Sequence, residues 1–139
     1  MTRKLILIAV LVVLLVLAAS PQPNWTYTGA KTYYVKSNGV NVIRLNCSMK
    51  FDWRASDGKL ACLDPSYMRC TATNLQSGWY ASGVAHGCSS PAYDIIGTGF
   101  SLWDVYYYGA RKGKADVFVS SYQDTTPPNW TWTIQESVP

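Results

Sequence analysis

IRLNCSMKFDWR, residues 43–54, alternates without a break between apolar and polar side chains. A period of two residues is typical of a β-strand with one face in a core and the other in water, whereas a helix would spread the same residues around its whole circumference. Residues at about 3.3 Å each would make this strand roughly 40 Å long, so we expect a bend or bulge along it. Its apolar residues are Ile43, Leu45, Cys47, Met49, Phe51 and Trp53.

Turn signals flank this strand on both sides. Asn38-Gly39 favours a tight hairpin that pairs residues 33–35 with 40–45, and Asp57-Gly58 favours a second hairpin that returns residues 60–63 against 51–53. Residues 86–93 resemble a loop, and 111–113 resemble the tip of a later hairpin. The sequence therefore predicts an all-β fold, a single antiparallel β-sandwich or barrel-like domain of about eight strands. The other expected strands are 24–28, 31–36, 67–73, 78–84, 100–108, 115–122 and 130–134.

The N-terminus has the composition of an export signal. Arg3 and Lys4 precede an uncharged apolar run, 5–19, and small residues follow it. We expect a hydrophobic helix that is either a signal peptide cut after Ala18 or an uncleaved membrane anchor, the only membrane contact expected. The predicted organisation is thus 1–18 leader or anchor, 19–30 spacer and N-terminal extended strand, and 31–139 a disulfide-stapled domain that is secreted or displayed on the cell surface.

Four cysteines follow the leader: Cys47, Cys62, Cys70 and Cys88. Export and the absence of a C-x-x-C pair favour two disulfides over a zinc site. A hairpin at Asp57-Gly58 would place Cys62 roughly 13 Å along the strand from Cys47, too far for a bridge between them. Of the two remaining pairings, the sequence favours Cys47–Cys88 with Cys62–Cys70.

Net charge argues against a nucleic-acid partner. The formal charge is +4, and removing Arg3 and Lys4 from the 12 basic residues leaves 10 against 8 acidic ones, or +2.

Asp104 interrupts an aromatic strand, and we interpret it as an outward residue that faces Lys114 or Asp116 across a hairpin.

The single histidine, His86, is the main candidate for catalysis. It could form a triad with Ser89 or Ser90 and with Asp94, yet no nucleophile elbow surrounds it. A loop histidine beside a disulfide is the preferred interpretation. No metal or cofactor is expected.

Two short motifs recur in the exported part. Three sequons, at Asn24, Asn46 and Asn129, are possible glycosylation sites in a glycosylating host. PNWTYT at 23–28 matches PNWTWT at 128–133 in five of six positions, so both ends of the domain carry an aromatic, threonine-rich strand. These strands could simply be two edges of one sandwich, or the N-terminal strand could dock into a neighbouring subunit.

Three hypotheses about function follow. The preferred one is a non-enzymatic extracellular domain for assembly or adhesion, a filament or surface-structure subunit that uses terminal strand addition to protein partners or to itself. The alternative is a glycan- or peptide-binding module, and the least favoured is a small secreted enzyme or toxin that uses His86. The assembly candidates are Trp25, Tyr27, Trp130 and Trp132, and the binding candidates are Trp79, Tyr80, Tyr106, Tyr107 and Tyr108.

Overall fold

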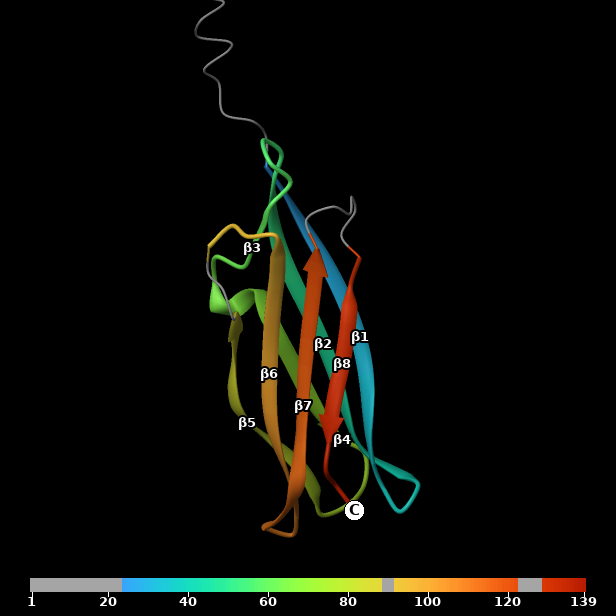
Figure 1. Cartoon of the computed structure of the whole chain (residues 1–139). Coiled ribbons are helices and arrows are strands. Elements are labelled where there is room, and N and C mark those ends of the chain that lie inside the picture. Colours follow the sequence, from blue (N-terminus) through green and yellow to red (C-terminus); the bar gives the residue numbers. More distant parts are fainter. Residues whose placement is uncertain (1–23, 89–91, 123–128) are drawn as a thin grey trace, which may run out of the picture.

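The computed structural model describes residues 24–88, 92–122 and 129–139, and the strands within them form two four-stranded antiparallel sheets (Figure 1). The expected leader, residues 1–18, lies outside the described part of the chain. Within that part no helix is long and apolar enough to cross a membrane. Sheet A contains β1 (Asn24–Ser37), β2 (Val40–Arg54), β3 (Leu60–Ala61) and β4 (Met68–Asn74), with a short 3-10 turn, η1 (Pro65–Tyr67), before β4. Sheet B contains β5 (Trp79–Cys88), β6 (Ile96–Tyr107), β7 (Ala110–Tyr122) and β8 (Thr131–Glu136).

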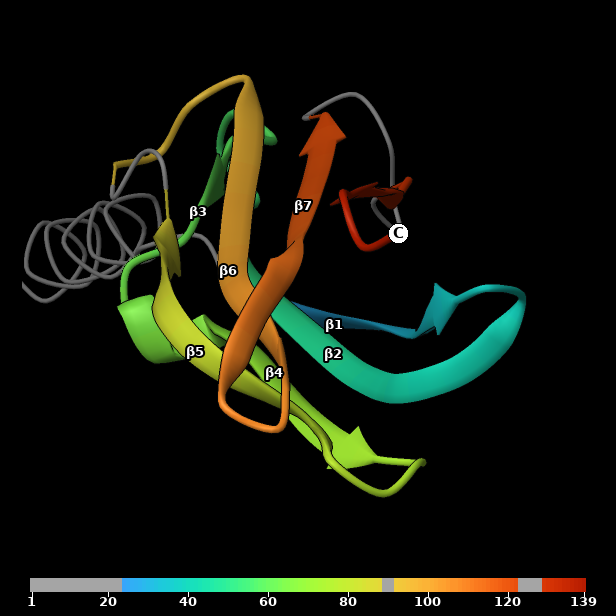
Figure 2. The same cartoon turned by 90° about the horizontal axis from the view of Figure 1, so that it is seen from below.

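The alternating stretch forms most of β2, at the centre of sheet A, and its burial pattern is the predicted one. Ile43, Leu45, Met49 and Phe51 are fully buried, and the polar residues between them lie on the outer face. A register shift opposite Val35 places Val42 as a bulge just before this stretch, and β2 is strongly bent (Figure 2). The predicted all-β fold of about eight strands in antiparallel sheets is therefore confirmed.

One core lies between the two sheets, because residues from both contribute to the same buried cluster. Val105, Val117 and Val119 of sheet B join the β2 residues there. Glycines let the sheets approach closely: a Cβ on Gly97 would lie 2.7 Å from the Phe51 ring, and one on Gly99 would lie 2.7 Å from Met49 Sδ. Gly97 and Gly99, near the start of β6, thus have a packing role.

The Asn38-Gly39 turn is confirmed, with φ angles of 50° and 80°, and so is the pairing of residues 60–61 with the end of β2. The later hairpin differs from the prediction. Its turn is Tyr108-Gly109 rather than residues 111–113, which belong to β7. His86 also lies in a strand, because β5 extends through Cys88 instead of ending in a loop at Val84.

The predicted disulfide pairing is wrong. The bridges are Cys47–Cys70 and Cys62–Cys88. β3 occupies the edge of β2 only at residues 52–53, so β4 pairs with the rest of the same edge and brings Cys70 directly opposite Cys47, with 4.0 Å between their Cα atoms. The prediction considered the β2–β3 hairpin and omitted this second partner of β2.

The strands run between two distinct ends of the molecule (Figure 1). β1 starts at Asn24 at one end. The turns β1–β2, β4–β5 and β6–β7 and the C-terminus lie at the other end. This second end carries the aromatic residues described next, and we call it the aromatic end.

Candidate functional site

Five aromatic side chains gather at the aromatic end: Trp79, Tyr80, Tyr106, Tyr107 and Tyr108. Antiparallel pairing of β5 with β6 sets Trp79 opposite Tyr107 and Tyr80 opposite Tyr106. Tyr80 and Tyr106 stack nearly parallel with ring centroids 5.0 Å apart, and Trp79 and Tyr107 lie 4.9 Å apart. The sequence identified these residues as candidates, and strand pairing brings them together as two pairs that lie on opposite faces of sheet B.

Tyr108 occupies an unusual backbone position in this group. Its φ is +45°, a left-handed conformation that bulky residues rarely adopt and that tight hairpins usually assign to Asn, Asp or Gly. Its N–H donates to the Gly78 carbonyl at 2.9 Å, and its ring leaves no room for a Cβ on Gly78. Its side chain is nevertheless 70% exposed. The turn therefore presents a tyrosine ring to solvent at a cost in backbone energy.

A hollow of about 570 Å³ opens beside the rings of Trp79, Tyr107 and Tyr108. No lining residue carries a charge: hydroxyl and carboxamide side chains stand next to the aromatic rings. Such a surface can stack on an apolar face and hydrogen-bond to neutral polar groups at its rim. The lining consists of Ser37, Asn38, Val40, Val42, Gln76, Ser77, Trp79, Tyr107 and Tyr108.

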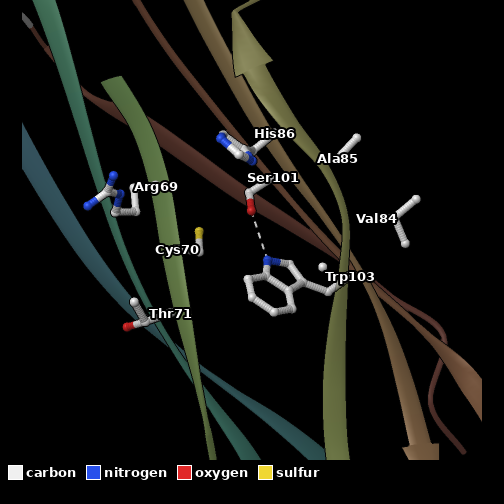
Figure 3. A pocket seen from close by; sticks show the side chains of 9 residues that line it. Arg69, Cys70, Thr71, Val84, Ala85, His86, Ser101 and Trp103 are labelled. Carbon is white, nitrogen blue, oxygen red and sulfur yellow. Dashed lines mark hydrogen bonds between the residues drawn. The ribbon is translucent and has the colours of Figure 1, made fainter. Parts of the chain in front are cut away.

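A second cavity, of about 480 Å³, lies between β4 and β5 and contains His86 (Figure 3). His86 pairs across the strands with Ser101, and both residues line the cavity with Trp103. Ser101 is only 2% exposed, and its Oγ accepts a hydrogen bond from Trp103 Nε1 at 2.8 Å. The sequence analysis missed Ser101, since its proximity to His86 follows only from the register of β5 and β6.

The predicted triad does not assemble in the described residues. Ser89 and Ser90 lie outside them. Asp94 forms an isolated bridge with Leu60, and its Oδ1 accepts from the Ile95 N–H at 2.7 Å. None of the nine residues that line the His86 cavity is acidic. The cavity therefore supplies a histidine and a serine without a carboxylate to orient them.

The terminal strands β1 and β8 are edge strands of their respective sheets. Trp130, just before β8, stacks on Phe51 at 5.1 Å and covers Gly29 of β1. Trp132 lies 6.3 Å from Trp130, and Trp25 and Tyr27 lie 4.8 and 6.3 Å from Trp53. The two matching motifs thus occupy the two sheet edges, and β1 pairs with β2 of its own chain from Asn24 to Ser37.

Side-chain bonds also join β1 to the C-terminal segment. The Lys36 N–H donates to Glu136 Oε1 at 3.2 Å, and Ser37 Oγ donates to the Pro139 carbonyl at 2.8 Å. The two edges therefore meet on one side of the molecule, as Figure 1 also shows.

The carboxylates mostly serve local structure. Asp104 forms an ion pair with Arg111 at 3.0 Å, although its cross-strand neighbour is Lys114, as predicted. Asp52 accepts hydrogen bonds from Thr26 Oγ1 and from the Tyr67 hydroxyl. The hydrogen bond between Tyr67 and Asp52 raises the pKa of Tyr67. No group of three metal-ligating side chains occurs among residues 24–88, 92–122 and 129–139.

The sequons occupy different environments. Asn24 begins β1, and Asn129 is exposed shortly before β8. Asn46 is exposed on the outer face of sheet A, where its Oδ1 accepts from Thr32 Oγ1 at 3.0 Å. Glycosylation of these residues stays a prediction.

No protein-family model matches this chain, and searches of curated proteins and of solved structures also find no match. Function is therefore inferred from the residues themselves.

Proposed function

We propose that this chain is a non-enzymatic domain that acts outside the cytoplasm in adhesion, by binding a neutral glycan at the aromatic end. The observation that carries the proposal is the uncharged hollow beside Trp79, Tyr107 and Tyr108. A sugar ring has an apolar C–H face that suits an aromatic ring, and a rim of hydroxyls that suits the side chains of Asn38 and Gln76.

Two further features support this proposal. The left-handed Tyr108 keeps an exposed ring in place at an energetic cost, and strained residues of this kind cluster at functional sites. Two intramolecular disulfides are compatible with an oxidising extracellular environment, as the export signal predicts.

A glycan array followed by calorimetry tests the proposal. We expect binding to neutral oligosaccharides that weakens about tenfold in Tyr107→Ala and in Tyr108→Ala, because each loses one stacking face. Tyr122→Ala is the matched control, since Tyr122 is also exposed but ends β7, far from the aromatic end. An array without neutral hits, or equal affinity in all three variants, would contradict the proposal.

Self-association by strand addition is the second candidate function, and the unequal protection of the two edges favours it. β1 carries Lys31 on its core-facing side, opposite Cys47. The ladder between β1 and β2 is also interrupted by the bulge at Val42 of β2. Inward charges and bulges are devices that block edge pairing. β8 contains neither a lysine, a proline nor a bulge from Thr131 to Glu136. The proposed docking edge is therefore β8, whereas the sequence pointed to the N-terminal strand.

Light scattering after size exclusion, over a range of protein concentrations, tests this second candidate. We expect dimers or larger species that disappear in Thr133→Lys, which places a charge on the outer side of β8. Lys112→Thr, on β7, is the control and should leave the assembly unchanged. A monomer at every concentration would exclude strand addition.

A further inference from the structure

We propose that the outer face of sheet A is a second binding surface, which takes an acidic polysaccharide. The site is independent of the aromatic end. The residues that carry it point away from the core on three adjacent strands, because they alternate with the buried residues of β2 and β4. We call this surface the basic face and define it by Arg44, Lys50 and Arg69, with the polar residues between them.

The cations of the basic face lack carboxylate partners, unlike three of the six other cations in the described strands. Among the described residues, Arg44, Lys50 and Arg69 form no ion pair, whereas Arg54, Arg111 and Lys114 each have an aspartate within 3.1 Å. Asp52 is the one acidic residue among the outward positions of these described strands, and Thr26 and Tyr67 already bond to it. The modest net charge of the domain is therefore concentrated on one face.

In Figure 3 the side chain of Arg69 lies on the outer side of β4, although Arg69 also lines the cavity between β4 and β5. Arg69 and Thr71 lie on the side of β4 away from Trp103 and His86, while Cys70 between them points toward the cavity. The register supports this placement, since Arg69 pairs with Ser48 and Thr71 with Asn46, both outward residues of β2.

Neutral hydrogen-bonding groups fill the spaces between the cations. Arg44 pairs with Thr73, and Lys50 pairs with Thr28. Arg44 Nε is buried without a hydrogen-bond partner among the described atoms, so an external anionic group would pair with the terminal nitrogens of this half-buried residue. The interleaved groups are Thr28, Thr32, Asn46, Ser48, Thr71 and Thr73.

The spacing of the cations suits a linear polymer. Arg44 and Lys50 lie on one strand and are about 20 Å apart at 3.3 Å per residue, and Arg69 lies on the adjacent strand, about 4.8 Å to the side. A small anion could bridge Lys50 and Arg69 at most, because Arg69 pairs with Ser48, two residues along β2 from Lys50. An extended chain with repeated negative groups, laid along β2, could contact all three at once.

Sugar polymers fit this face better than membranes or nucleic acids. Apart from Ala30 and Tyr34, the outward residues on β1, β2 and β4 are polar, so little apolar surface could enter a bilayer. Single-stranded nucleic acids bind to a basic groove that also offers several stacking aromatic side chains, and Tyr34 is the one aromatic ring among the described outward residues of these strands. Carboxylate or sulfate groups would pair with the arginines, and sugar hydroxyls would bond to the threonines.

Binding of the full exported domain to immobilised heparin and to polygalacturonate tests the inference, with dextran as the uncharged comparison. We expect binding to both acidic polymers, release by NaCl, and no binding to dextran. The double variant R44Q/R69Q should bind at least about tenfold more weakly, because it loses two charge-assisted contacts. K59Q/K112Q removes the same charge away from the face and should retain binding.

Several results would overturn the inference. One is an equal loss of heparin binding in both double variants, which would indicate unspecific electrostatic attraction. Another is tighter binding of the wild type to phosphatidylserine vesicles or to duplex DNA than to the acidic polymers. A glycan on Asn46 in the native protein, detected by intact mass, would also overturn it because it would cover the face. Tyr107→Ala should leave heparin binding unchanged, so failure here and failure at the aromatic end are distinguishable.

Discussion

At the scale of single residues, the most informative position is Tyr108. Its left-handed backbone is unfavourable for a tyrosine, and its exposed ring gains little from packing. Asparagine adopts a left-handed conformation far more readily than tyrosine. Neither Asn-Gly nor Asp-Gly is present at this point, so no sequence signal marked the turn, and the prediction placed it at the basic residues 111–113 instead. The physical reason for the error is that a tyrosine occupies a position that a hairpin usually assigns to a small polar residue.

Tyr108→Asn should raise the free energy of unfolding by up to about 1 kcal/mol while it weakens glycan binding, because the backbone strain is relieved and the ring is lost. Gly78→Ala should have the opposite effect on stability, with a loss of about 1–2 kcal/mol. Its φ of +82° disfavours alanine, and the new methyl group would meet the Tyr108 ring. Urea unfolding measures both. A less stable Tyr108→Asn would show that the ring contributes packing rather than exposure.

Asp57 makes a pH-dependent contribution to stability. The hydrogen bond from Arg54 lowers the pKa of Asp57 from 3.8 to about 2. A lowered pKa in the folded state stabilises the fold above the unfolded-state pKa, and this contribution disappears as the pH falls from about 4 through 2. The urea midpoint of the wild type should therefore fall further between pH 5 and about 2 than that of Asp57→Asn. The same pH dependence in both proteins would contradict this assignment.

At the scale of elements, β2 organises sheet A because one of its edges has two partners. Its alternation predicted which side chains are buried, and the Asn38-Gly39 turn predicted its pairing with β1. Nothing in that periodicity states which strand lies on the other edge. Met68, Cys70 and Ala72 also alternate, and they match Met49, Cys47 and Leu45 across the sheet. A search for matching alternation could have found this partner and, with it, the correct disulfide.

The two disulfides should each stabilise the domain by about 3 kcal/mol, since they close loops of similar length, with sequence separations of 23 and 26 residues. We expect this loss in Cys47→Ala/Cys70→Ala and in Cys62→Ala/Cys88→Ala. Peptide mapping without reduction should recover the 47–70 and 62–88 links. A 47–88 link in the native protein would restore the pairing predicted from the sequence and refute the register of β4.

At the scale of the whole molecule, the sequence predicted the class of fold but not the meeting of distant segments. About eight alternating or aromatic stretches separated by turn signals indicate an all-β domain. The cluster of Trp79 with Tyr107 and the proximity of His86 to Ser101 depend on the register between β5 and β6, which single-strand patterns do not contain. The same holds for the two terminal motifs, whose similarity was visible but whose placement on adjacent edges required the fold.

Phe51 tests whether both sheets unfold as one unit. Its ring is fully buried, stacks on Trp130 and contacts Gly97 of sheet B. Phe51→Ala should therefore lower the free energy of unfolding by about 3–5 kcal/mol and shift tryptophan fluorescence and far-UV circular dichroism together. Lys112→Ala, at an exposed position of β7, should change stability by less than about 0.5 kcal/mol. Separate transitions for the two signals would show that the sheets unfold independently.

Asn24 and the aromatic end lie at opposite ends of the strands, and this has a mechanical consequence. Tension between a tether that precedes Asn24 and a glycan held at Tyr108 would run parallel to β1. Such a pull loads the β1–β2 ladder in shear, so the hydrogen bonds between residues 24–37 and 40–54 resist together instead of opening one after another. β1, which the sequence analysis considered as a strand that could dock into a neighbouring subunit, would then be the element that bears the load.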